Sequence, residues 1–90
     1  MKLGYKQKEV INTLLTIQGS FILMTIDYSD NSIQASISDD DNNDYEFIKL
    51  NMLHSLINKH IFKVEKIQKS LDIYQEKYRL KDHIKTPPLT

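Results

Sequence analysis

The C-terminal half of the chain carries apolar residues at a spacing of seven, and this pattern limits the fold more than any other feature. Residues seven apart lie two turns apart on the same side of an α-helix. The positions with this spacing are Leu50, Ile57, Val64, Leu71 and Tyr78, and Leu53, Ile67 and Tyr74 fill intermediate positions. The spacing therefore predicts helical structure over residues 44–82.

An unbroken helix of that length would span roughly 60 Å at about 1.5 Å per residue, which a compact chain of this size rarely contains. We therefore expect a break near "NKHIF", residues 58–62, and two helices. One long helix is the alternative, because a seam with this spacing also pairs two chains in a coiled-coil homodimer. Either arrangement would bury Leu53, Ile57, Val64 and Leu71.

The N-terminal part of the chain predicts one helix followed by a β-hairpin. Apolar residues recur at gaps of three and four over residues 5–18, and the pair Gly19-Ser20 supplies the helix end. Residues 21–28 and 33–38 are rich in strand formers and flank the turn sequence "SDNS". The predicted fold is a small α+β domain over residues 1–85, with helix, hairpin and two C-terminal helices (or one long helix) packed on the hairpin. Residues 86–90 are expected to form a flexible tail.

Acidic residues gather in the middle of the chain, although the formal net charge is zero. The stretch "SDDDNNDYEF", residues 38–47, contains four aspartates and a glutamate, and no lysine or arginine lies between Lys8 and Lys49. Asn43 and Glu46 have the spacing of a capping box for the following helix. Asp39, Asp40 and Asp41 are left without such a role. Together with Asp27 and Asp30 of the hairpin, they predict an acidic patch that binds a basic surface on another protein; a solvated loop is the alternative.

Known catalytic and metal-binding patterns do not fit the chain. A calcium loop starting at Asp39 would need glycine where Asp44 stands and glutamate where Leu50 stands. The chain has no cysteine, and His54, His60 and His83 lack the spacing of a helical zinc pair. Glycine-rich phosphate loops and nucleophile motifs are also absent from the sequence. We therefore expect no enzyme activity, no cofactor and no metal site.

These observations predict a small cytoplasmic interaction protein, a regulator or inhibitor that binds a basic, nucleic-acid-handling partner. Abundant lysine and isoleucine indicate AT-rich coding, as in low-GC bacteria, their phages and their plasmids. The longest apolar run, residues 21–24, is too short to cross a membrane.

The alternative function is nucleic-acid binding by a basic C-terminal helix. Its basic residues would be Lys63, Lys66, Lys69, Lys77, Arg79 and Lys81. A winged-helix arrangement, in which residues 62–80 form a β-hairpin wing, is disfavoured because their apolar residues follow helical spacing.

Overall fold

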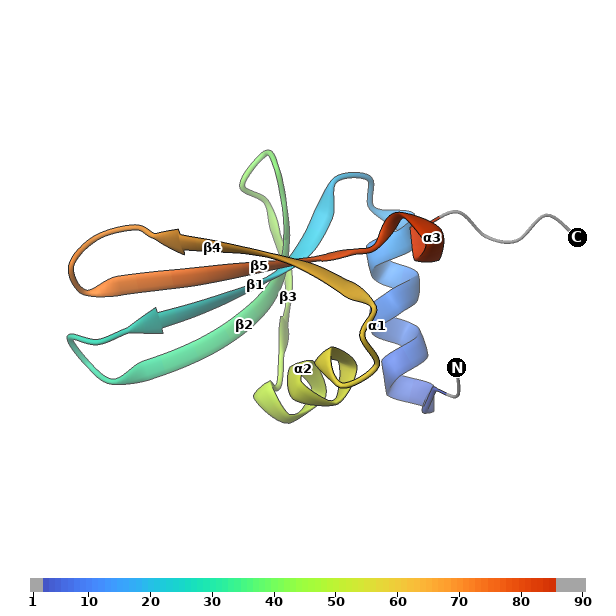
Figure 1. The fold of residues 1–90 in the computed structure, drawn as a ribbon, viewed down its shortest axis with the longest axis horizontal. Coiled ribbons are helices and arrows are strands. Elements are labelled where there is room, and N and C mark those ends of the chain that lie inside the picture. The colour runs from blue at the N-terminus through green and yellow to red at the C-terminus, as the bar shows by residue number, and fades with distance from the viewer. Residues whose placement is uncertain (1–2, 86–90) are drawn as a thin grey trace, which may run out of the picture.

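The computed structural model describes residues 3–85, which form a five-stranded antiparallel sheet with helices at one end (Figure 1). The elements follow in the order α1 (Tyr5–Thr16), β1 (Ser20–Asp27), β2 (Ser32–Asp39), β3 (Asp44–Ile48), α2 (Leu50–Ile57), β4 (Phe62–Gln68), β5 (Ile73–Leu80) and α3 (Asp82–Lys85). Among these residues, no helix is long and apolar enough to cross a membrane.

The strands lie in the order β3-β2-β1-β5-β4, so that β1 is central and β3 and β4 are the edges. Two long hairpins, β1–β2 and β4–β5, lie side by side because β1 pairs with β5. On β1, Ile22 lies between Ile37 of β2 and Tyr78 of β5. This register places every second residue of the two hairpins on the same face of the sheet.

The hydrophobic core lies between α1, α2 and one face of the sheet, which we call the inner face. Helix α1 is one-sided, and its buried residues Val10, Ile11 and Leu14 have the spacing of a single helical face. Helix α2 buries Leu53 and Leu56. The sheet contributes the alternate, inner-facing residues of its strands: Ile22, Ala35, Ile37, Ile48, Phe62, Tyr78 and Leu80. Alternation along the strands therefore supplies a core that the helices close.

The helices cover only one half of the inner face. In Figure 1, α1, α2 and α3 gather at one end of the sheet, while the hairpins β1–β2 and β4–β5 extend beyond them. The buried core ends accordingly, and Ile33, which faces inward near the far end of β2, is 49% exposed. We call this uncovered part the distal half of the sheet.

The fold predicted for the C-terminal part is wrong. Residues 44–82 hold two further strand regions, β3 and the hairpin β4–β5, and α2 is the one helix of more than a single turn among them. Residues 62–80 are predicted to be helical, but they form the β4–β5 hairpin. From the sequence alone a hairpin is disfavoured here, because the apolar residues follow helical spacing. The predicted tail at residues 86–90 lies outside the described residues.

Residues that are seven apart share a helix face, but in this hairpin they fall in unlike places. Tyr78 of β5 is 5% exposed, whereas Val64 on the edge strand β4 is 49% exposed and Leu71 in the β4–β5 turn is 97% exposed. Leu53, from an intermediate position of the pattern, is fully buried in α2. Ile57 is only partly buried. The predicted burial of Val64 and Leu71 is therefore wrong, and the seven-residue spacing has no structural role.

The predicted capping box at Asn43 and Glu46 is also wrong, because this segment turns the chain from β2 into β3. Asn42 adopts a positive φ of 65°, a conformation that asparagine tolerates better than most residues. The backbone N–H of Asn43 donates to the carboxylate of Asp39 at 3.0 Å, and no helix begins here. Within the acidic stretch, residues 39–42 form the turn between the strands, and residues 44–47 belong to β3.

Candidate functional site

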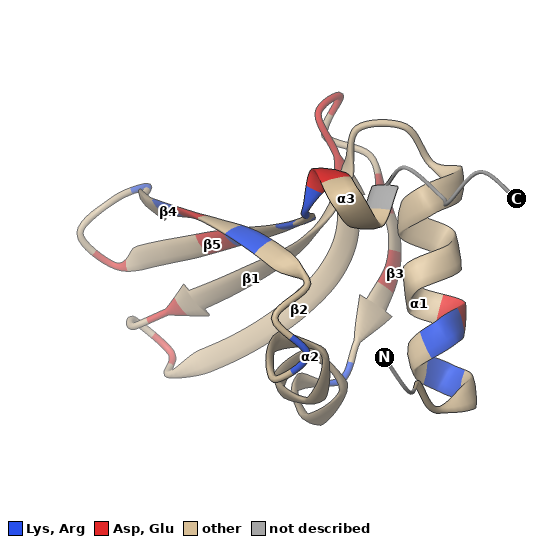
Figure 2. Cartoon of the chain, turned by 45° about the vertical axis from the view of Figure 1, so that its right-hand side comes forward, with Lys and Arg blue, Asp and Glu red and all other residues tan. Residues whose placement is uncertain are grey.

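The five predicted docking aspartates lie at opposite ends of strand β2. Asp27 ends β1 and Asp30 lies in the turn that follows, whereas Asp39 ends β2 and is followed by Asp40 and Asp41 in the β2–β3 turn. The strand between them has 8 residues, which at about 3.3 Å per residue separates the two groups by roughly 25 Å. Figure 2 shows the two acidic turns well apart. The structure therefore forms two small acidic turns and does not form one patch.

Asp39 is a structural residue of the β2–β3 turn. One of its oxygens accepts hydrogen bonds from the backbone N–H groups of Asp41, at 2.9 Å, and Asn43, at 3.0 Å. The other oxygen accepts from the Asn43 amide and the Tyr45 hydroxyl. The Tyr45 hydrogen bond, followed by those from Asn43, lowers the pKa of Asp39 to about 2, because all of them stabilise the ionised carboxylate. The side chain is largely withdrawn from solvent, with 7% of the residue exposed.

Asp40 is held by an ion pair across the end of the sheet. The Arg79 guanidinium of β5 donates to Asp40 at 2.6 Å, and this hydrogen bond holds the pKa of Asp40 below its ordinary value. The same guanidinium lies 4.6 Å from the ring centre of Phe21, and the ammonium group of Lys77 lies 4.7 Å from it. Phe21 is only 3% exposed on a face that α1, α2 and α3 leave uncovered, because these two cations shield it.

A hollow of about 340 Å³ lies on the outer face, opposite the helices. Phe21, Leu23 and Ile67 give it an apolar part, and Lys69 and Lys77 stand with Asp39 and Asp44 among its polar residues. The carboxylate of Asp39 accepts hydrogen bonds within the β2–β3 turn, and the ammonium group of Lys77 lies over the ring of Phe21. Ser38 donates to Asp44 at 2.6 Å. These side chains stabilise one another, and they form no nucleophile–base pair for catalysis.

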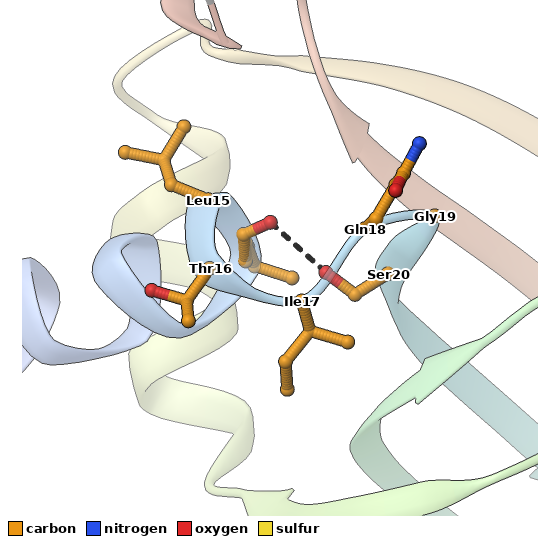
Figure 3. A pocket seen from close by; sticks show the side chains of 7 residues that line it. Leu15, Thr16, Ile17, Gln18, Gly19 and Ser20 are labelled. Carbon is orange, nitrogen blue, oxygen red and sulfur yellow. Dashed lines mark hydrogen bonds between the residues drawn. The ribbon is translucent and has the colours of Figure 1, made fainter.

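A larger hollow lies where α1 passes into β1 and is lined by residues 14–20 (Figure 3). The side chains of Leu15 and Gln18 point in different directions, and the dashed line marks the Ser20 hydroxyl donating to the Leu14 carbonyl at 3.0 Å. That bond satisfies both groups in the turn. The lining contains no acidic, basic or histidine side chain, so this hollow lacks the groups that acid–base chemistry requires.

The basic residues of the C-terminal half lie on both faces of the β4–β5 hairpin and do not form a stripe. Lys63 and Arg79 are cross-strand neighbours on the outer face, where Lys77 lies opposite Glu65. Lys66 lies on the inner face, opposite Glu76. The basic helix of the nucleic-acid alternative is therefore absent, and the cations that it would have carried are divided between the two faces, with Glu65 opposite Lys77 and Glu76 opposite Lys66.

The distal half of the inner face carries an exposed apolar surface. Ile26 of β1 lies between Ile33 of β2 and Tyr74 of β5, which forms a row across three strands. At the adjoining turns, Tyr28 is 55% exposed and Leu71 is 97% exposed. We call these five residues the distal patch. From the sequence alone, the strand residues of the distal patch are assigned to the hydrophobic core. The spacing of apolar residues shows which side chains share a face, but it does not show how far the helices extend over that face.

The two turns beside the distal patch are tied together, and with the end of β1 they carry three aspartates and one lysine, Lys69. The backbone N–H of Tyr28 donates to the carbonyl of Asp72 at 2.7 Å, joining the β1–β2 turn to the β4–β5 turn. Asp27 accepts hydrogen bonds from Ser29, and these bonds lower its pKa. Asp30 accepts from the Ser32 N–H at 3.0 Å. Asp27, Asp30 and Asp72 thus place three carboxylates at this end of the sheet.

Within residues 3–85, no three histidine, aspartate or glutamate side chains come close enough together to hold a metal ion. Comparison with protein-family models, with curated proteins and with solved structures finds no match for this chain.

Proposed function

We propose that this protein is a cytoplasmic protein–protein interaction module, a small regulator or inhibitor that binds its partner through the distal patch. The observation that carries the proposal is the incomplete cover of the sheet. Tyr28 and Ile33 expose about half of their surface near the half-buried Ile26 and Tyr74, and Leu71 in the adjoining β4–β5 turn is 97% exposed. Contiguous exposed apolar surface with a polar rim is typical of protein-binding sites.

The charges around the patch indicate the chemistry of the partner. Asp30 and Asp72 lie beside it at the joined turns, where Lys69 is the one basic residue, and Asp27 ends β1 on the opposite face. The ion pair of Asp40 with Arg79 lies at the other end of the sheet. The matching surface is therefore an apolar area flanked by lysine or arginine. Exposed carboxylates of this kind accelerate encounter with a basic partner, and they add less to the final affinity than the buried apolar contacts.

Capture from an extract of the encoding cells tests the proposal. The immobilised chain is compared with a variant that carries Tyr28→Ser, Ile33→Ser and Leu71→Ser, three residues with large exposed fractions. The matched control carries Gln34→Ala and Phe47→Ala, two exposed residues away from the patch. Circular dichroism establishes that both variants are folded.

We expect one protein to be retained by the parent chain and by the control and to be lost with the patch variant. Retention by all three chains would place the binding site elsewhere. Retention of nothing specific by the parent chain would contradict an interaction function.

A further inference from the structure

The two edges of the sheet differ in whether they can accept another strand. The β3 edge is only 5 residues long, and its pairing with β2 is interrupted by a register shift between Ile37 and Ser38. Such irregular, short edges resist further pairing. Strand β4 has 7 residues and pairs with β5 in an unbroken register, from Phe62 opposite Leu80 to Gln68 opposite Tyr74. The β4 edge is therefore the regular one.

The hydrogen bonds at the two ends of β4 identify which backbone groups face this free edge. The carbonyl of Ile61 accepts from the Lys81 N–H at 2.9 Å, and the Lys69 N–H donates to the Ile73 carbonyl at 3.0 Å. The direction of the backbone groups alternates along a regular strand. Odd-numbered residues of β4 therefore point toward β5, and Phe62, Val64, Lys66 and Gln68 point their N–H and C=O groups outward.

The order of charges along β4 matches only one central register with a second antiparallel copy. A two-fold axis normal to the sheet places the central residue opposite itself in the second copy. A centre at Lys63, Glu65 or Lys66 therefore brings like charges together, which destabilises cross-strand pairing. A centre at Val64 places Lys63 of each chain opposite Glu65 of the other. Centres nearer the ends of β4 leave fewer residues paired.

We infer that this chain forms a homodimer in which the two β4 strands pair antiparallel about Val64, joining two five-stranded sheets into one. Val64 would pair with Val64 of the second copy, and Phe62 with Lys66, through the outward-facing backbone groups. The Val64 side chain, which is 49% exposed, would pack on its counterpart. This dimer uses the edge of the sheet and not the distal patch, so it stands independently of the proposed partner.

Charge exchange at the edge tests the dimer. On either side of the central Val64 pair, residue 63 of one chain lies opposite residue 65 of the other. Lys63→Glu therefore places two carboxylates opposite each other at both positions, and Glu65→Lys places two ammonium groups opposite each other. Each single variant should dimerise about ten-fold more weakly or worse, since two opposite-charge pairs become like-charge pairs. The double variant K63E/E65K restores both opposite-charge pairs and should dimerise like the parent chain. Equal amounts of the two single variants should form a heterodimer, because their charges are complementary.

Sedimentation velocity from low to high micromolar concentration supplies the measurement, with circular dichroism to confirm that each variant folds. Lys63 also forms an exposed ion pair with Asp82 at 3.3 Å, which E65K leaves intact. Agreement between E65K and K63E therefore excludes loss of that ion pair as the cause. A parent chain that stays monomeric throughout would overturn the inference. So would single variants that dimerise as strongly as the parent, or a folded double variant that fails to recover.

Discussion

The hydroxyl of Tyr78 donates a hydrogen bond to the carboxylate of Glu76, two residues before it on the inner face of β5. Tyr78 is 5% exposed and belongs to the core, and its ring packs edge-on against Phe62. The second oxygen of Glu76 accepts from the Tyr74 hydroxyl at 2.8 Å, on the distal side. Glu76 therefore lies on the boundary between the covered and the uncovered halves of the sheet.

Removing the hydroxyl of Tyr78 should destabilise the fold modestly. Tyr78→Phe loses the bond to Glu76 and should reduce the free energy of unfolding by roughly 0.5–1.5 kcal/mol, the usual contribution of one hydrogen bond. Tyr74→Phe removes the equivalent bond on the more exposed side and should cost less. Urea denaturation measures both. An equal or larger loss for Tyr74→Phe would contradict the boundary at Glu76.

Two leucines that the helical interpretation predicts to be buried alike should respond very differently to truncation. Leu53 is fully buried, so Leu53→Ala should cost roughly 2–5 kcal/mol of stability through lost burial and the cavity that remains. Leu71 is 97% exposed, and Leu71→Ala should change stability by less than about 0.5 kcal/mol. Chemical denaturation measures the free energy of unfolding of both variants. Similar decreases for Leu53→Ala and Leu71→Ala would support the predicted helices, which the structure contradicts.

Stability should fall in acid partly because Asp39 becomes protonated. Its pKa is lowered from 3.8 to about 2 in the folded chain, so the unfolded chain binds protons more readily between these values. The stabilisation from Asp39 is therefore present above pH 3.8 and is lost as the pH falls toward about 2. Asp39→Asn should flatten the dependence of unfolding free energy on pH in this window. The same substitution at the exposed Asp41 is the control, and an identical flattening there would argue against the specific role of Asp39.

The first helix and the first hairpin could be predicted from the sequence because their local patterns agree with their surroundings. Helix α1 buries one face, and in the middle of β2 the buried Ala35 and Ile37 flank the half-buried Ser36. The turn after β1 contains Asn31, which adopts a positive φ of 57°. Helical spacing, strand alternation and turn chemistry each point to the element observed.

The second hairpin could not be predicted in this way because half of its inner face is uncovered. Lys66 and Glu76 lie opposite each other at inner-facing positions, which breaks the apolar alternation expected of strands. The turn "KSLD", residues 69–72, contains serine and aspartate but no glycine, proline or asparagine, so its turn signal is weaker than that of "SDNS". The separation of the five predicted docking aspartates could not be predicted for a related reason: Asp30 and Asp40 are close in sequence, but strand β2 separates them. The exposed distal patch depends on where the helices end, which is a tertiary property.

Proline substitutions should reveal which residues of β4 face the free edge. The Val64 N–H points outward, so Val64→Pro should lower the melting temperature of the dilute chain by less than about 5 °C. The Glu65 N–H points toward β5, so Glu65→Pro removes a ladder bond and should lower it by more than about 10 °C. Val64→Pro should also prevent dimerisation. Greater damage from Val64→Pro than from Glu65→Pro would contradict the alternation inferred for this strand.

Photocrosslinking from two adjacent residues in the encoding cells tests the distal patch most directly. Ile33 and Gln34 are both exposed, but successive residues of β2 point to opposite faces, so a benzophenone side chain at position 33 faces inward and one at position 34 faces outward. After irradiation, the protein with the group at position 33 should form a covalent adduct with one cellular protein, and the protein with the group at position 34 should not. Equal adducts from both positions, or an adduct from position 34 alone, would contradict binding through the distal patch.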